Sequence, residues 1–167
     1  MIVLLMGVAG SGKTTIGRLL ASQLGWAFYD ADDFHPPANV AKMAAGTPLT
    51  DADRAPWLNV LRERIATSLA SGENAVIACS ALKAAYRQIL QPDPAEPIRL
   101  VYLRGSPELL ASRLAARSGH FMKPSMLASQ LATLEEPAGA LVADIARPPE
   151  NLAAFIRDSL GLRAASS

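Results

Sequence analysis

The first fourteen residues constrain the fold more tightly than any other stretch of the chain. Residues 2–6 are apolar and predict a short buried strand, and residues 7–14 match the pattern G-x-x-x-x-G-K-[ST] at every fixed position. The three glycines allow a tight bend in which successive backbone N–H groups point inward and form a nest for an anion. A helix that begins near Lys13 adds the positive end of its dipole. The stretch therefore predicts a phosphate-binding loop, the P-loop, between a strand and a helix.

The residues of this loop have separate expected roles. Lys13 would reach the β- and γ-phosphates of a bound nucleotide, and the Thr14 hydroxyl would bind Mg²⁺. A glycine-rich turn without a ligand is the simpler alternative, but the strand before the motif and the amphipathic helix after it favour nucleotide binding. We expect the nucleotide-binding set to comprise Gly7, Val8, Ala9, Gly10, Ser11, Gly12, Lys13, Thr14 and Thr15.

Composition narrows the class of protein. The 167 residues suit a single domain, 1–167, and half of them are apolar, whereas the formal net charge of +1 argues against a protein that coats nucleic acid. The single cysteine, Cys79, excludes an internal disulfide and fits a reducing compartment, and its apolar neighbours predict a buried, unreactive thiol. Neither a transmembrane stretch nor a signal peptide is recognisable. We therefore expect a cytoplasmic protein that binds neither membranes nor nucleic acid.

Apolar segments alternate with helical patterns along the chain. Strands are expected at 2–6, 26–29, 75–79, 98–103 and, more weakly, 141–145. Helices are expected at about 13–24, 38–46, 51–70 after a Thr50 or Asp51 cap, 81–90 after a Ser80 cap, 107–118, 124–136 and 149–160, and residues 163–167 are expected to fray. Nearly all-apolar strands alternating with helices indicate an α/β fold with a parallel sheet covered on both faces. Ligands of such sheets bind at the carboxyl ends of the strands.

Carboxylates follow the second predicted strand directly. Asp30 and Asp32 can point into one crevice, one toward a metal ion and the other toward an acceptor hydroxyl, as phosphoryl transfer requires. An acidic, solvated loop is the alternative, and the position beside a P-loop favours the functional interpretation. The third strand ends at Ser80 rather than at an acidic residue, which leaves Asp30 or Asp32 as the expected metal partner. This pattern is typical of small-molecule kinases rather than of motor ATPases or GTPases.

Basic residues gather later in the chain. Arg113 and Arg117 lie four residues apart before a segment that begins with Gly119, and we expect residues of about 113–137 to form a lid over the phosphates. Lys83 and Arg87 have the same spacing and would suit a substrate carboxylate. For each pair a solvated helix face is the simpler alternative. Two further residues each have two possible roles. Trp57 is expected in the core or as a wall of the acceptor pocket, and Asp51 is expected to cap the helix rather than to reach substrate hydroxyls.

Several longer strings resemble the gluconokinases, P-loop kinases that make 6-phosphogluconate from D-gluconate and ATP. Beyond the P-loop, the matching strings are D-A-D-D-F-H-P at 30–36, N-V-A-K-M at 39–43, G-T-P-L-T-D at 46–51, D-R-A-P-W-L at 53–58, C-S-A-L-K at 79–83, Tyr86-Arg87, G-H-F-M at 119–122 and T-L-E-E-P at 133–137. They occur in the expected order and span most of the chain. Together they are far more specific than the P-loop alone.

The resemblance implies a fold and a set of roles. The fold would be the P-loop NTPase fold of the nucleoside-monophosphate-kinase and shikimate-kinase type, with five parallel strands in the order 2-3-1-4-5, flanking helices and a mobile lid. Mg²⁺ and ATP would be required, and a homodimer is common. Asp32 would approach the C6 hydroxyl of gluconate as base or orienting group, and Asp30 would organise Mg²⁺ together with Thr14. The implied catalytic residues are Lys13, Asp32 and Arg117; the implied gluconate site is Asp32, His35, Arg54, Lys83, Arg87 and His120; Arg113 and Arg117 would serve the nucleotide.

Two other functions stay open at this stage. Another small-molecule kinase, for shikimate or for a nucleotide, would use the same donor site with a different acceptor site. A nucleotide-binding module without phosphoryl transfer would keep the P-loop but have no need for Asp30, Asp32 or the basic residues of the lid.

Overall fold

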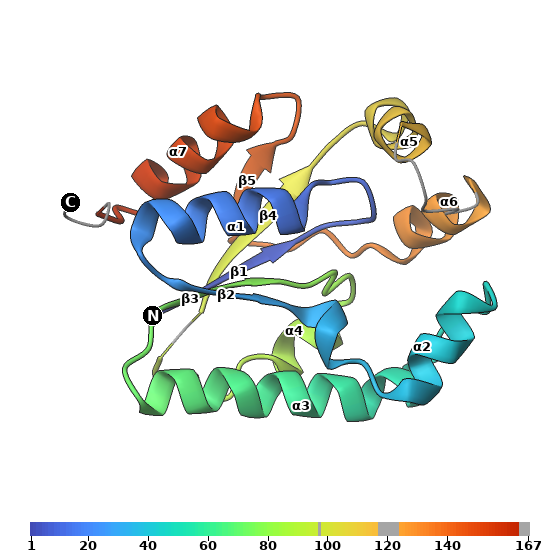
Figure 1. Ribbon diagram of the computed structural model, residues 1–167, viewed down its shortest axis with the longest axis horizontal. Helices are drawn as coiled ribbons and strands as arrows, with labels where there is room; N and C mark the ends of the chain where they lie inside the picture. The colour runs from blue at the N-terminus through green and yellow to red at the C-terminus, as the bar shows by residue number, and fades with distance from the viewer. Residues whose placement is uncertain (97, 117–123, 164–167) are drawn as a thin grey trace.

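The computed structural model describes residues 1–96, 98–116 and 124–163. Its centre is a parallel sheet of five strands in the order β2-β3-β1-β4-β5 (Figure 1), which confirms the predicted order. The strands are β1 (Ile2–Met6), β2 (Ala27–Asp30), β3 (Ala75–Ala78), β4 (Arg99–Arg104) and β5 (Leu141–Asp144). The helices are α1 (Lys13–Leu24), the short η1 (Ala31–Phe34), α2 (Pro37–Ala44), α3 (Asp51–Ala70), α4 (Ala84–Ile89), α5 (Pro107–Ala115), α6 (Pro124–Thr133) and α7 (Pro149–Ser159).

Helices cover both faces of the sheet, because its central strands are apolar on both sides. Helices α1 and α7 lie on one face and α3 lies on the other (Figure 1). Strand β1 shows the division, since Val3 and Leu5 pack in the cluster beneath α1 and α7, whereas Leu4 and Met6 pack in the cluster beneath α3. All five residues of β1 are buried, as a strand at the centre of a parallel sheet requires. The carboxyl ends of the strands are therefore the part of the sheet that can receive a ligand.

The start of α4 differs from the sequence prediction. Ser80 does not cap this helix, which begins at Ala84 with Lys83 as its N-terminal cap residue. The Ser80 carbonyl instead accepts a hydrogen bond from the Gly7 N–H at 3.4 Å, and Ala81 adopts a left-handed φ of 42°. The loop after β3 is thus folded against the P-loop, and the helix starts only after this contact has been made.

The start of α3 is as predicted, with one correction. Thr50 is the cap: its hydroxyl accepts from the Asp53 N–H at 3.1 Å, and the Asp53 carboxylate accepts from the Thr50 N–H at 2.9 Å. These reciprocal bonds form a capping box, which stabilises the first turn. Asp51, which was expected to cap, is the first residue of the helix and uses its carboxylate elsewhere. Within the described residues, no helix is long and apolar enough to cross a membrane.

Candidate active site

The P-loop has the conformation that its glycines predict. Gly7, Gly10 and Gly12 have φ values of 154°, 81° and 88°, and α1 begins directly after Gly12. Lys13 Nζ donates to the Val8 carbonyl at 3.1 Å, so the lysine lies across its own loop. The result is a ring of backbone amides at the positive end of a helix, with an ammonium group beside it. This arrangement suits the phosphates of a nucleotide.

Two helices from the predicted lid region contact this loop. From α6, Gln130 Oε1 accepts a hydrogen bond from the Ala9 N–H at 2.7 Å. From α5, Arg113 Nη2 donates to the Ile145 carbonyl at 2.6 Å, and Arg113 Nη1 lies 3.8 Å from the position that a Cβ atom on Gly12 would occupy. Arg113 therefore lies over the helix N-terminus, where its charge can reach phosphate oxygens.

Thr14 and Asp30 form a pair of oxygen donors beside the phosphate nest. Thr14, in the first turn of α1, donates its hydroxyl hydrogen to Asp30 Oδ2 at 2.7 Å. Asp30 is the last residue of β2, and the pairing of β2 with β3 holds it at the carboxyl edge of the sheet. A hydroxyl and a carboxylate are hard oxygen ligands, the type that Mg²⁺ prefers. The two residues predicted to hold the metal therefore lie together.

Asp32 lies two residues beyond Asp30, in the short helix η1, and is close enough to Asp30 and Lys13 for their charges to interact. The Asp32 N–H donates to Asp30 Oδ1 at 3.2 Å, which starts the short helix η1. The pKa of Asp32 is raised from its usual value by partial desolvation of its charged form and by the charge of Asp30, while 84% of its side-chain surface stays open to solvent. Lys13 and His35 act in the opposite direction. A carboxylate with a raised proton affinity, at the edge of a phosphate site, suits the acceptance of a hydroxyl proton.

His35 and Trp57 form one wall of this region. Their rings stack with centroids 4.3 Å apart and planes 12° apart, and Trp57 Nε1 donates to the Ala31 carbonyl at 2.7 Å. Burial lowers the pKa of His35, and the nearby charge of Arg54 lowers it further, while Asp32 raises it. Trp57 is thus a core residue, which confirms one of its two predicted roles. Its ring also packs against His35, a predicted substrate residue.

A cluster of hydrogen-bond donors from α3 and from the start of α4 converges on the carboxylate of Asp51. Lys83 Nζ lies 3.0 and 2.8 Å from the two carboxylate oxygens of Asp51, and the Tyr86 hydroxyl donates to the same carboxylate. Arg54 Nη1 lies 3.8 Å from Asp51 and 3.4 Å from the Tyr86 hydroxyl. These bonds lower the pKa of Asp51, with the Lys83 bond as the largest cause. The set that binds the Asp51 carboxylate has the chemistry needed to bind the carboxylate of a ligand.

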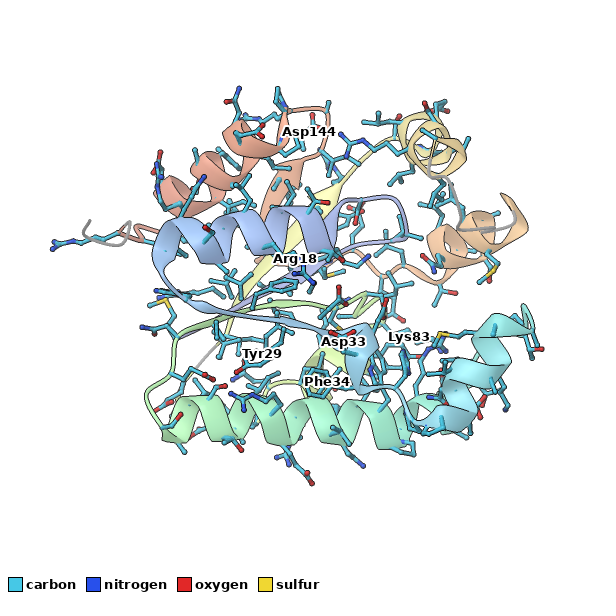
Figure 2. All side chains as sticks on the ribbon, in the orientation of Figure 1. Arg18, Tyr29, Asp33, Phe34, Lys83 and Asp144 are labelled. Carbon is cyan, nitrogen blue, oxygen red and sulfur yellow. The ribbon has the colours of Figure 1, made fainter. Side chains whose placement is uncertain are left out.

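The predicted substrate residues are not all brought together. Figure 2 shows Lys83 on the same side of the molecule as Asp33, near α2 in this view. Arg87 turns away from Lys83, because Arg87 Nη1 donates to the carbonyls of Ala81 and Leu82, each at 3.0 Å. Burial lowers the pKa of Arg87. Arg87 thus holds the loop after β3, and a direct contact with substrate stays a prediction for it.

Two predicted residues, Arg117 and His120, lie outside the described residues. The structure also adds three polar residues that the sequence analysis did not select: Asn39, Tyr86 and Gln130. Tyr86 and Asn39 occur in strings that support the family resemblance, which was the one available signal for them. Gln130 carries no pattern that distinguishes it from a polar residue on a helix surface.

Comparisons with known proteins identify the family of this chain. The family model described as shikimate kinase matches residues 9–147. A gluconokinase of Gluconobacter oxydans (strain 621H) is 52% identical over 135 residues, which cover 81% of this chain and 75% of the relative. The thermoresistant gluconokinase of Escherichia coli (strain K12) is 43% identical over 157 residues, or 92% and 89% of the two chains. The crystal structure of a gluconokinase from Sinorhizobium meliloti 1021 superposes with a TM-score of 0.82 at 42% identity and covers 95% of this chain and 94% of that one. Since relatives more than 40% identical match most of this chain and the P-loop motif is present, the chain belongs to the gluconokinase family of P-loop kinases.

Proposed function

We propose that this protein transfers the γ-phosphoryl group of ATP to the C6 hydroxyl of D-gluconate, giving 6-phospho-D-gluconate and ADP. The observation that carries the proposal is a series of charged neighbours: Asp32 interacts with Lys13 of the P-loop and with His35, and His35 interacts with Arg54, which belongs to the donor cluster with Lys83 and Tyr86. The phosphate site binds the nucleotide, the donor cluster binds an anionic acceptor, and Asp32 is linked to both through these neighbours. The similarity to gluconokinases supports gluconate as that acceptor.

On the donor side, the P-loop amides, Lys13 and Arg113 would hold the phosphates. Thr14 and Asp30 would hold Mg²⁺, and their oxygen atoms fit this ion because Mg²⁺ binds through few protein ligands and completes its shell with phosphate and water. When bound, the ion supplies positive charge that offsets the charge developing on the β- and γ-phosphate oxygens. Arg117, in the proposed lid of about residues 113–137, is proposed to stabilise the same phosphate charge.

On the acceptor side, the gluconate carboxylate would replace the Asp51 carboxylate on Lys83 and Tyr86. The C6 hydroxyl would then face Asp32. As the bond between this oxygen and the γ-phosphorus forms, the bond to the β–γ bridging oxygen breaks, and the hydroxyl proton passes to the Asp32 carboxylate. ADP leaves with the electron pair of the broken bond. Arg87 and His120 are proposed to contact the remaining polar groups of the acceptor, and His35, whose side chain is 5% exposed, is proposed to act on the acceptor through Asp32.

The proposal is tested by ATP turnover with a panel of acceptors. ADP formation is followed with D-gluconate, with related sugar acids and with shikimate, each with Mg²⁺. We expect turnover with D-gluconate and none with shikimate; the reverse result would overturn the assignment of the acceptor. The Lys13→Ala variant should lose turnover but keep the melting temperature of the wild type, because the hydrogen bond from Lys13 Nζ to the Val8 carbonyl lies within the P-loop itself. Unfolding of that variant would contradict the separation of fold and catalysis.

Assembly and location stay predictions of the family resemblance. A homodimer is proposed, and light scattering of the purified protein at several concentrations tests it. A cytoplasmic location is proposed as well, and fractionation of cells that express the protein tests it.

A further inference from the structure

Asn39 is a buried polar side chain that the proposed mechanism does not use. It lies in α2 and is 4% exposed, so each of its polar hydrogens needs a partner. Asn39 Nδ2 donates to the Asp53 carbonyl at 2.9 Å and lies 3.3 Å from His35 Nδ1. One side-chain amide thus links the first turn of α3 to the histidine beside Asp32.

These two contacts determine which nitrogen of His35 carries the proton. A carbonyl oxygen can only accept, so the group that faces Asp53 must be the NH₂ group of Asn39. Its second hydrogen is then directed at His35 Nδ1, which must accept through a lone pair. Because burial lowers the pKa of His35, the ring is neutral near pH 7 and its one proton lies on Nε2.

The orientation of the ring directs this proton toward Asp32. The His35 side chain is 5% exposed, and it is held flat against Trp57, whose own Nε1–H is bonded to the Ala31 carbonyl. His35 Nε2 lies 4.0 Å from Asp32 Oδ1, which is beyond hydrogen-bond distance. The Asp32 side chain is 84% exposed, so rotation about its own bonds can close this gap while the histidine stays fixed.

We propose that Asn39 is a positioning residue that keeps the proton of His35 on Nε2, so that His35 donates a hydrogen bond to Asp32 during phosphoryl transfer. The inference rests on the proposed function for the role of Asp32. A donor on one carboxylate oxygen leaves the other oxygen to accept the proton of the acceptor hydroxyl. Hydrogen bonds to a charged carboxylate are stronger than those between neutral groups, so this bond can hold the Asp32 carboxylate in one orientation.

The tautomer can be read directly from the wild-type protein. The chain has two histidines, so a long-range ¹H–¹⁵N spectrum of the labelled protein shows two imidazole rings, and the His35→Phe variant identifies the signals of His35. At about pH 7.5 the wild type should show a protonated Nε2 and an unprotonated Nδ1 at His35. A protonated Nδ1 would overturn the proposal without the need for any variant of Asn39.

The Asn39→Asp variant reverses the hydrogen bond. Whether the new carboxyl group is charged or gives its proton to the Asp53 carbonyl, the atom that faces His35 Nδ1 becomes an acceptor. The proton of the neutral ring should therefore move to Nδ1, which leaves Nε2 without a hydrogen to donate to Asp32. We expect kcat with D-gluconate to fall about tenfold or more, the size expected for a lost bond to a charged group, with little change in the KM for ATP. Asn59→Asp makes the same chemical change on an exposed turn of α3 and should change neither the spectrum nor kcat.

A second pair of variants covers the case in which Asn39→Asp does not fold. His35→Gln keeps an N–H donor near the place of Nε2, whereas His35→Phe keeps the stack on Trp57 and has no donor. His35→Gln should retain most of the wild-type kcat, and His35→Phe should lose about tenfold or more. Equal kcat values for the two variants would overturn the proposal. Absence of gluconate turnover in the wild type would overturn the proposed function and the role toward Asp32, whereas the spectrum decides the tautomer independently.

Discussion

Gly10 is a P-loop position at which both the backbone conformation and the packing on α5 oppose an added methyl group. Its φ of 81° is one that alanine adopts only at a cost of about 1–2 kcal/mol, of which about 0.4–1 kcal/mol is offset by the lower entropy of the unfolded chain. A Cβ atom there would lie 3.0 Å from Leu114 Cγ and 3.1 Å from the Leu110 carbonyl oxygen, both in α5. Crowding of this kind adds about 1–3 kcal/mol. Gly10→Ala should therefore destabilise the fold by about 2–4 kcal/mol.

Gly46 supplies the matched control. It has a similar φ of 72°, but nothing lies within 4 Å of the Cβ position. Gly46→Ala should cost about 1 kcal/mol, which lowers the melting temperature of a chain of this size by about 2–4 °C, and Gly10→Ala should lower it at least twice as much. Gly10→Ala alone should also raise the KM for ATP, because the loop must move away from α5. Equal losses of melting temperature in the two variants would refute the close packing of the P-loop on α5.

Three further predictions follow from single sites. Burial raises the pKa of the Cys79 thiol to about 12, so a thiol reagent should label the protein only after unfolding, and rapid labelling of the folded protein would show that the thiol is accessible. Thr14→Val should raise the Mg²⁺ concentration needed for half-maximal turnover, whereas Thr14→Ser should not; similar Mg²⁺ curves for both would exclude the hydroxyl as a ligand. Burial lowers the pKa of His35 in the folded state, while Asp32 raises it and Arg54 lowers it, so the unfolded state takes up the proton first as the pH falls. The contribution of neutral His35 to the free energy of unfolding is therefore complete above the unfolded pKa of about 6.5 and is lost progressively below it. Urea unfolding between about pH 7.5 and 5.5 should show a steeper decline in the free energy of unfolding for wild type than for His35→Phe.

The sequence predicted the elements of the fold closely because their signals are local. Each strand is an apolar run, and the observed ends lie within about two residues of the expected ones. The Thr50 cap was predictable for the same reason, since both members of its capping box lie within four residues. The P-loop was predictable from its pattern alone.

The errors arose where distant contacts override local preference. Ser80 has the residue type of a helix cap, but its carbonyl binds the Gly7 N–H, and no local pattern reveals a contact across more than seventy residues. Asp51 was assigned to capping, yet its carboxylate binds Lys83 and Tyr86, which lie more than thirty positions away. Asn39 carried no chemical signal in the sequence, because its importance depends on the side chain of His35 and the carbonyl of Asp53 being brought together.

The central claim is that Asp32 receives the proton of the C6 hydroxyl while the P-loop presents the γ-phosphate. The most direct test is to identify by phosphorus and carbon NMR which oxygen of D-gluconate carries the phosphate after reaction with ATP and Mg²⁺, and to measure the rate for wild type and Asp32→Asn. We predict phosphate on the C6 oxygen and a loss of about 100-fold or more in kcat for Asp32→Asn, with ATP binding retained. Phosphate on another oxygen, or a wild-type rate in Asp32→Asn, would contradict the claim.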